Sequence, residues 1–478
     1  MSLVEQLFRV KPIAMLEADL AGEHRLRRAL GPWALTSLGV GAIIGAGIFV
    51  LTGLAAHEYA GPALVLSFVI AGLGCAFAAL CYAEFAAMIP VAGSAYTYAY
   101  ATLGELLAWI IGWDLILEYG MASATVAHGW SKYFLHLLEL FGIHLPPAIT
   151  SDPFSTPEAY FNLPAAGIVL VVTTILVIGI RESATFNATM VAVKLAVILF
   201  VIFMGAQYVN PQNWEPFLPF GWKGVAAGAA YVFFAYIGFD SVSTQAEEAR
   251  NPQRDVPIGI IASLAICTAL YIGVAAVLTG MVPYTEIDVD APLAAAFARY
   301  GFNAAVLIIS VGAVAGITSV LLVLMLSQPR VFFAMARDGL LPEEFFGRVH
   351  PRFRTPHRST ILTGTVVAIV AGLLPIQALA EMVNIGTLFA FVVVCSAVLI
   401  MRYTNPDQPR PFRTPFFPLV PILGILFNLG MMFSLGSHNW LRLAAWLAIG
   451  LAIYFAYSRH HSRLAKSKAI PLRRARRS

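Results

Sequence analysis

The sequence predicts an all-α integral membrane protein, and three observations support this fold class. Only 12% of its 478 residues are charged and 59% are hydrophobic, whereas a typical soluble domain has about 25% charged residues. The apolar residues form long runs, and roughly 20 such residues in a row can cross a bilayer as a helix. Lys and Arg are concentrated in alternate connections between these runs, as expected for a chain that crosses a membrane repeatedly.

Twelve apolar runs have about the length of a membrane span, and they divide the chain into three regions. These regions are a tail at 1–32, a membrane domain at 33–457 and a basic tail at 458–478. The predicted spans are 33–56, 62–90, 103–130, 163–180, 188–207, 224–247, 256–281, 302–329, 359–375, 378–401, 416–435 and 439–457. Only the stretch "LLPIQALAEM" interrupts the shared apolar run at 359–401, so the division into a ninth and a tenth span depends on it.

The charge distribution predicts the orientation of the chain. An even number of spans places both termini on one side, and that side receives 25 of the 30 Lys and Arg residues. The other side receives only four, and Lys194 lies within a span. Because positive residues accumulate on the inner side, both termini are predicted to be cytoplasmic, in the plasma (inner) membrane. The basic C-terminal stretch is read as a topology signal that meets anionic lipid, and no nucleic-acid partner is expected.

Glycines interrupt the first and sixth spans at their centres. The first contains "GAIIGAGIFV" at residues 41–50, and the sixth contains Gly238 followed closely by Asp240. Glycine weakens a helix by roughly 1 kcal/mol relative to alanine, and close packing between helices is the simplest alternative reason for it. Interruptions at corresponding positions of two halves, however, are typical of transporters that bind substrate at broken helices.

Several stretches carry a family resemblance. They are "GAIIGAGIF", "CYAEFAAMIPVAGSAYTYAYATLGE", "GWDLILEYG", "FFAYIGFDSVSTQAEEARNPQRDVPIGI" and "QPRVFFAMARDGLLPEEF". In order and spacing the sequence resembles the amino acid–polyamine–organocation (APC) superfamily, and within it bacterial homologues of the cationic amino acid transporter (CAT) family. The resemblance implies the leucine-transporter fold, in which two inverted five-helix repeats are followed by two helices and helices one and six are unwound. It also implies alternating access around one central amino acid site.

The resemblance further implies which residues bind the substrate. Backbone groups would meet the amino acid's carboxylate at Ile43, Ile44, Gly45, Ala46 and Gly47, because the start of a half-helix favours an anion. Carbonyls would accept hydrogen bonds from the α-ammonium at Phe234, Ala235 and Ile237. Leu324 resembles the floor of the side-chain pocket. Close relatives often have threonine where this chain has Ala46, so a hydroxyl is missing near the substrate.

Ionisable residues inside spans are functional candidates. Glu118 and Asp240 lie within spans three and six and give the interior an acidic character suited to a cationic side chain. Lys194 lies in span five, where the resemblance places a lysine at the position that binds an ion in sodium-coupled relatives. It is therefore the candidate for proton coupling. The alternative for each carboxylate is a buried group satisfied by neighbouring donors, and for Lys194 it is a lysine that extends to the membrane surface.

These observations predict a secondary active transporter of L-amino acids, most simply cationic ones such as arginine, lysine or ornithine, driven by protons. The alternatives are a neutral (alanine-like) amino acid or polyamine permease or exchanger, and, from another class, a channel or nutrient sensor. A polyamine has no carboxylate, so it would leave the backbone groups of the first break without a partner. No enzyme, metal or cofactor motif is present in the sequence. The expected partners are the amino acid, protons and membrane lipids, and a small accessory membrane helix is compatible with the resemblance.

Overall fold

The computed structural model describes residues 3–12, 15, 30–89, 94–178, 184–353 and 355–466. Within these residues every regular element is helical, apart from an isolated bridge between Leu30 and Ala249. Eight helical stretches are long and apolar enough to cross a membrane, and four further apolar helices are shorter. The predicted all-α class is thereby confirmed, and the eight long stretches have the length and composition that membrane spans require. Arg181, most of the N-terminal tail and the basic tail from residue 467 lie outside the described residues.

The helices follow one another along the whole described chain. The first half contains α1 (Leu3–Leu7), α3 (Pro32–Ile43), α4 (Thr52–Ala55), α5 (Leu64–Met88), α6 (Ser94–Thr102), α7 (Glu105–Leu140), α8 (Leu163–Ile178) and α9 (Ala184–Gly205). The second half contains α10 (Gly221–Val232), α11 (Pro252–Met281), α12 (Pro292–Ala298), α13 (Asn303–Arg337), α14 (Glu343–Phe346), α15 (His357–Leu373) and α16 (Ile376–Thr404). The chain continues with α17 (Leu419–Ser434), α18 (Ser437–Ile453), α19 (Arg459–His461) and α20 (Arg463–Lys466).

Each of the twelve predicted spans contains a helix, although several boundaries differ. The ninth and tenth spans are separate helices, α15 and α16, divided at Pro375. Helix α7 is 36 residues long and continues ten residues past the predicted end of the third span. Its last turns carry Lys132, His136 and Glu139, which ended the apolar pattern but not the helix. The number of helices that cross the membrane stays a prediction.

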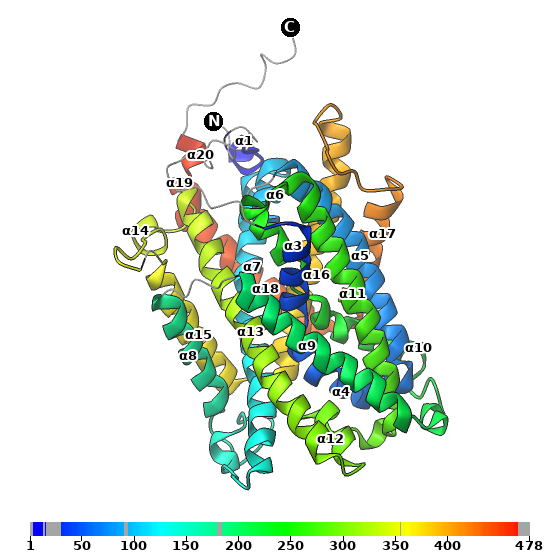
Figure 1. The fold of residues 1–478 in the computed structure, drawn as a ribbon. Helices are drawn as coiled ribbons and strands as arrows, with labels where there is room; N and C mark the ends of the chain where they lie inside the picture. Colours follow the sequence, from blue (N-terminus) through cyan, green and yellow to red (C-terminus); the bar gives the residue numbers. More distant parts are fainter. Residues whose placement is uncertain are drawn as a thin grey trace.

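The helices of the two halves pack in matching pairs. Helix α5 packs against α11, α7 against α13 and α8 against α15. The pair α3 and α11 has a counterpart with the halves exchanged, which is the pair α10 and α5. In the same way, the pair α7 and α16 has its counterpart in the pair α13 and α9. The first and last described helices, α1 and α20, lie at the same end of the molecule (Figure 1). Helices α3 and α10 have exposed residues in their first turns, but their last turns and the segments that follow them are buried inside the bundle.

Both of these helices are interrupted. Helix α3 ends at Ile43, Ile44 is extended with ψ of 102°, and a π-helical segment begins at Gly47. Helix α10 ends at Val232 and is followed by a 3₁₀ turn, after which Ile237 is extended with ψ of 133°. Gly238 has φ of +124°, a conformation that residues with a Cβ rarely adopt. The second break therefore depends on glycine.

Candidate functional site

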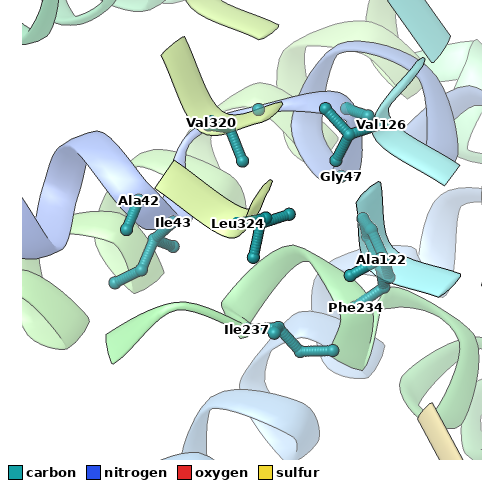
Figure 2. Close-up of a pocket in the computed structure, with 11 residues that line it drawn as sticks. Ala42, Ile43, Gly47, Ala122, Val126, Phe234, Ile237, Val320 and Leu324 are labelled. Atoms are coloured by element: carbon teal, nitrogen blue, oxygen red, sulfur yellow. The ribbon is translucent and has the colours of Figure 1, made fainter. Parts of the chain in front are cut away.

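A small cavity lies between the two broken segments and the helices α7 and α13. Its walls come from residues 42, 43 and 45–47 at the first break, Phe234 and Ile237 at the second, Ala122 and Val126 of α7, and Val320 and Leu324 of α13. In Figure 2 the side chains of these segments face one another across the cavity, with Leu324 near its centre. Its volume is about 10 Å³, which is room for one water molecule.

The glycines of the first break allow the two broken segments to touch. A Cβ atom on Gly47 would collide with the Cα atom of Ala235, and one on Gly45 would lie 2.9 Å from a methyl group of Val320. A larger residue at position 47 would push the two broken segments apart, whereas one at position 45 would press on the Val320 side chain of α13. The glycines therefore have a local cause, which is close packing at the cavity, with backbone against backbone at Gly47.

Most of the predicted binding residues line this cavity, and some do not. Its walls include Ile43, Gly45, Ala46, Gly47, Phe234, Ile237 and Leu324. Ile44 and Ala235 are buried behind the walls. The second half-helix begins at Gly47, and the first amides of a helix have no intrahelical partner. The amides of Ile48 and Phe49 already donate to the Gly45 carbonyl. The structure thus brings the start of this half-helix and the second break, about 190 residues further along the chain, to one cavity.

A tyrosine of α11 joins the two breaks. The Tyr271 hydroxyl lies 3.0 Å from the carbonyl oxygen of Ile43 and 2.8 Å from that of Ala235, and its side chain is fully buried. One hydroxyl proton is shared between two carbonyls, so each carbonyl keeps lone pairs for a further donor. We did not anticipate this residue from the sequence, where the only signal was a single hydroxyl in the apolar run "ALYIG".

Lys194 of α9 reaches the end of the first half-helix. Its Nζ atom donates a hydrogen bond of 2.7 Å to the carbonyl oxygen of Gly41, and its side chain is fully buried. Gly316 of α13 makes room for the lysine, because a Cβ atom there would lie 3.2 Å from Lys194 Cγ. The lysine therefore does not extend to the membrane surface, and it connects the fifth predicted span to the first break.

Glu118 and Asp240 lie close to the cavity but outside its walls. Both are about 99% buried, and the Tyr119 hydroxyl donates a hydrogen bond of 3.1 Å to Asp240 Oδ2. Glu118 Oε1 and Asp240 Oδ1 have no hydrogen-bond partner among the described residues. Glu118 is four residues before Ala122, so the two side chains share a face of α7. In this conformation the two carboxylates therefore do not line the cavity.

The side chains that line the cavity are all apolar. Four of them were not predicted from the sequence: Ala42, Ala122, Val126 and Val320. Small aliphatic residues in an apolar span give no sequence signal that separates a pocket wall from helix packing. Only the arrangement of the four segments identifies them.

Residues 128–133 of α7 pack against the first break and the half-helix that follows it. Gly129 packs on Ala46, and the Tyr133 hydroxyl donates a hydrogen bond of 2.9 Å to the carbonyl oxygen of Phe49. His128 Nε2 lies 3.4 Å from Asp152 in the loop after α7. Burial acts to raise the pKa of the Asp152 carboxyl, but hydrogen bonds, first from His128 and then from the chain at Ser155, outweigh burial and lower that pKa to about 2.

Comparison with known proteins identifies what the chain is similar to. Residues 30–438 match the family model described as amino acid permease. The chain is 51% identical to the methylthioribose transporter of Bacillus subtilis over 97% of this chain and 100% of that protein. It is also 51% identical to the branched-chain amino acid permease BcaP of the same organism, over 96% and 99%. It is 44% identical to the vacuolar cationic amino acid transporter 2 of Arabidopsis thaliana over 85% of this chain and 65% of that protein.

Proposed function

Because this chain belongs to the amino acid permease family, whose members are membrane transporters and not enzymes, we propose that it is a proton-coupled secondary transporter of L-amino acids. The observation that carries the proposal is the meeting of two helix breaks at one cavity. An α-amino acid presents a carboxylate and an ammonium together. The amides that begin the second half-helix suit the carboxylate, and the carbonyls of the other break suit the ammonium.

For the side chain of the substrate, the geometry best supports a neutral, apolar amino acid. Ala122, Val126, Val320 and Leu324 form an apolar wall, and a charged group placed against such a wall without a partner is costly. This is the neutral alternative from the sequence analysis. It agrees with the name of one relative, which is a branched-chain amino acid permease.

A cationic substrate is the second candidate, and one observation favours it. Glu118 is fully buried one helical turn from Ala122, and one of its oxygens has no hydrogen-bond partner among the described residues. An arginine or lysine side chain that passed Ala122 would reach Glu118 and then Asp240. This would require the cavity to lengthen toward the two carboxylates.

The packing supports the inverted-repeat architecture that the resemblance implies. If α3, α5, α7, α8 and α9 correspond in order to α10, α11, α13, α15 and α16, then the observed helix pairs map onto one another when the halves are exchanged. We propose twelve spans, with both termini cytoplasmic and the protein in the plasma membrane. The small cavity suits the alternating-access cycle, because the segments must separate to admit an amino acid and close again around it.

Proton coupling is assigned to Lys194. Its hydrogen bond to the Gly41 carbonyl holds α9 against the first half-helix, and the strength of that bond depends on whether the amine carries a proton. A lysine favours its neutral form when it is buried and its protonated form when water reaches it, so a change between these surroundings releases or takes up a proton. Opening of the site to one side at a time would supply that change, so movement of the break and movement of the proton would occur together.

A competition panel in proteoliposomes tests the assignment of substrate. Labelled leucine uptake is measured against unlabelled leucine, alanine, arginine, a polyamine and methylthioribose, with the outside acidic. We expect leucine and alanine to compete and arginine to compete weakly. Preferential competition by arginine, lost at least tenfold in Glu118→Gln or Asp240→Asn, would establish the cationic candidate instead. Uptake of labelled methylthioribose, without uptake of labelled leucine or arginine, would contradict amino acid transport.

A further inference from the structure

A second and larger groove lies away from the central cavity, between α11 and the loop that joins α16 to α17. Its volume is about 440 Å³, which falls within the range of roughly 300–1,000 Å³ typical of small-molecule sites. One wall is the start of α11, and the other is Pro411 and Phe412 of the loop. Both walls lie toward the end of the molecule that holds α1 and α20 (Figure 1), which is the predicted cytoplasmic side.

The wall formed by α11 changes character along its length. Arg254 and Gln253 lie at its beginning, and the residues that follow are apolar, at Pro257, Ile258, Ile261, Ala262 and Ala265. Their spacing of three or four residues places them on one face of the helix. From 254 to 265 the helix rises about 16 Å, which is close to the thickness of one bilayer leaflet, about half of 30 Å.

The charged end of the groove is open to an anion. Arg254 is exposed and forms no ion pair within the part of the chain that the structure describes, and no acidic side chain lines the groove. Arg413, beside the loop wall, is also exposed. The nearest acid on α11, Asp255, is buried and accepts a hydrogen bond from the backbone of Asn251. A phosphate group at this end of the groove would therefore meet the Arg254 guanidinium and no carboxylate of the groove walls.

The opposite wall is held in place by a single carboxylate of α5. Glu84 accepts two hydrogen bonds from Arg402, at 2.8 and 2.7 Å, and one of 2.8 Å from the amide of Thr414. Arg410 lies 3.3 Å from the same carboxylate. Pro411 and Phe412 lie between two residues that are anchored in this way. The groove is therefore preformed, and it does not depend on a mobile loop closing over a ligand.

We propose that this groove binds one anionic phospholipid of the cytoplasmic leaflet. Arg254 would bind the headgroup phosphate, and the apolar face of α11 with Phe412 would hold an acyl chain. Positive charge at one end and one leaflet's length of apolar wall match this amphiphile, whereas a free phosphate would leave the apolar wall unused. The cytoplasmic leaflet carries a negative surface potential that favours such sites.

The bound lipid would act on transport through α11. This helix carries Tyr271, which bridges the two breaks, and its N-terminal side is tied to the start of α3 by the hydrogen bond from the Arg250 amide to the Leu30 carbonyl. A lipid lodged between α11 and the loop fixed on α5 would stabilise α11 in its position. The inference goes beyond the proposed function and does not depend on it, because lipid binding is measured without any amino acid.

Native mass spectrometry of the full chain tests the proposal. The protein is extracted from vesicles of phosphatidylcholine and phosphatidylglycerol at a ratio of three to one, and the retained lipids are counted. We expect one retained phosphatidylglycerol, and roughly tenfold lower retention in Arg254→Gln because a charge-assisted contact is lost. Ile261→Trp fills the apolar part and is expected to release the lipid without any change in charge. Arg348→Gln, which removes an exposed arginine far along the sequence, is the matched control.

Three results would overturn the proposal. The first is equal retention of phosphatidylglycerol by the unaltered protein, Arg254→Gln and Ile261→Trp. The second is equal retention of phosphatidylcholine and phosphatidylglycerol, which would show an unselective apolar surface. The third is a disulfide-linked dimer of the Ala265→Cys variant, formed both in vesicles of phosphatidylcholine alone and in vesicles that contain phosphatidylglycerol. This dimer would show that a second copy of the protein covers the groove. The native cysteines are all buried and do not interfere, and gel-filtration elution confirms that each variant is folded.

Discussion

Replacement of Lys194 by methionine separates proton coupling from substrate binding. Methionine keeps the apolar stem that packs beside Gly316 but removes the ammonium that donates to the Gly41 carbonyl at 2.7 Å. A hydrogen bond from a charged group contributes about 1.5–3 kcal/mol, so the equilibrium between the states of the proposed alternating-access cycle is expected to shift roughly 10- to 150-fold. The cavity walls are unchanged, because Lys194 does not line them.

The assay is leucine accumulation in proteoliposomes with the outside one pH unit more acidic. One proton per substrate supplies about 1.4 kcal/mol under this gradient, which sets a ceiling of about tenfold accumulation. We expect the unaltered protein to approach this ratio and Lys194→Met to stay near onefold, while exchange of internal for external leucine continues. Lys223→Met, which removes an exposed lysine, is expected to behave like the unaltered protein. Tenfold accumulation by Lys194→Met with an unchanged pH profile would refute the assignment.

Three further changes test other parts of the structure. Gly47→Ala should abolish uptake, because the new methyl group collides with Ala235. A methyl group at Gly167 would have no neighbour within 4 Å, so Gly167→Ala should leave uptake unchanged. Equal loss of uptake in both variants would disprove the close approach at Gly47 as the cause. Leu324→Ser should enlarge the pocket and favour longer substrates in the competition panel, whereas an unchanged order of preference would place Leu324 outside the site. Asp152→Asn should lower the unfolding temperature at pH 7. Since the carboxyl pKa is about 2 when folded against 3.8 normally, that difference should be complete above pH 4 and vanish as the pH falls through 2; a pH-independent difference would contradict the role of the carboxylate.

The sequence by itself determined the class of protein and the outline of the bundle. Long apolar runs can bury their backbone polar groups in a bilayer only as helices or closed barrels, so composition and run length sufficed to predict helices at twelve places. The glycines at 41–47 and Gly238 also marked both breaks correctly, because glycine in the centre of a span is unfavourable unless the backbone needs it. The end of α7 was missed because the helix continues where its sequence becomes polar.

The tertiary structure decided which side chains surround the cavity. Ala122, Val126 and Val320 have the same composition and spacing as residues that only pack helices, and Tyr271 is one hydroxyl in an apolar run. Glu118 and Asp240 are buried as predicted, but their distance from the cavity walls depends on how α7 and the second break rotate against each other. Apolar periodicity indicates that a residue is buried, but it does not indicate which neighbour the residue faces. The reason is that the pairing of helices far apart in sequence is decided by the packing between them.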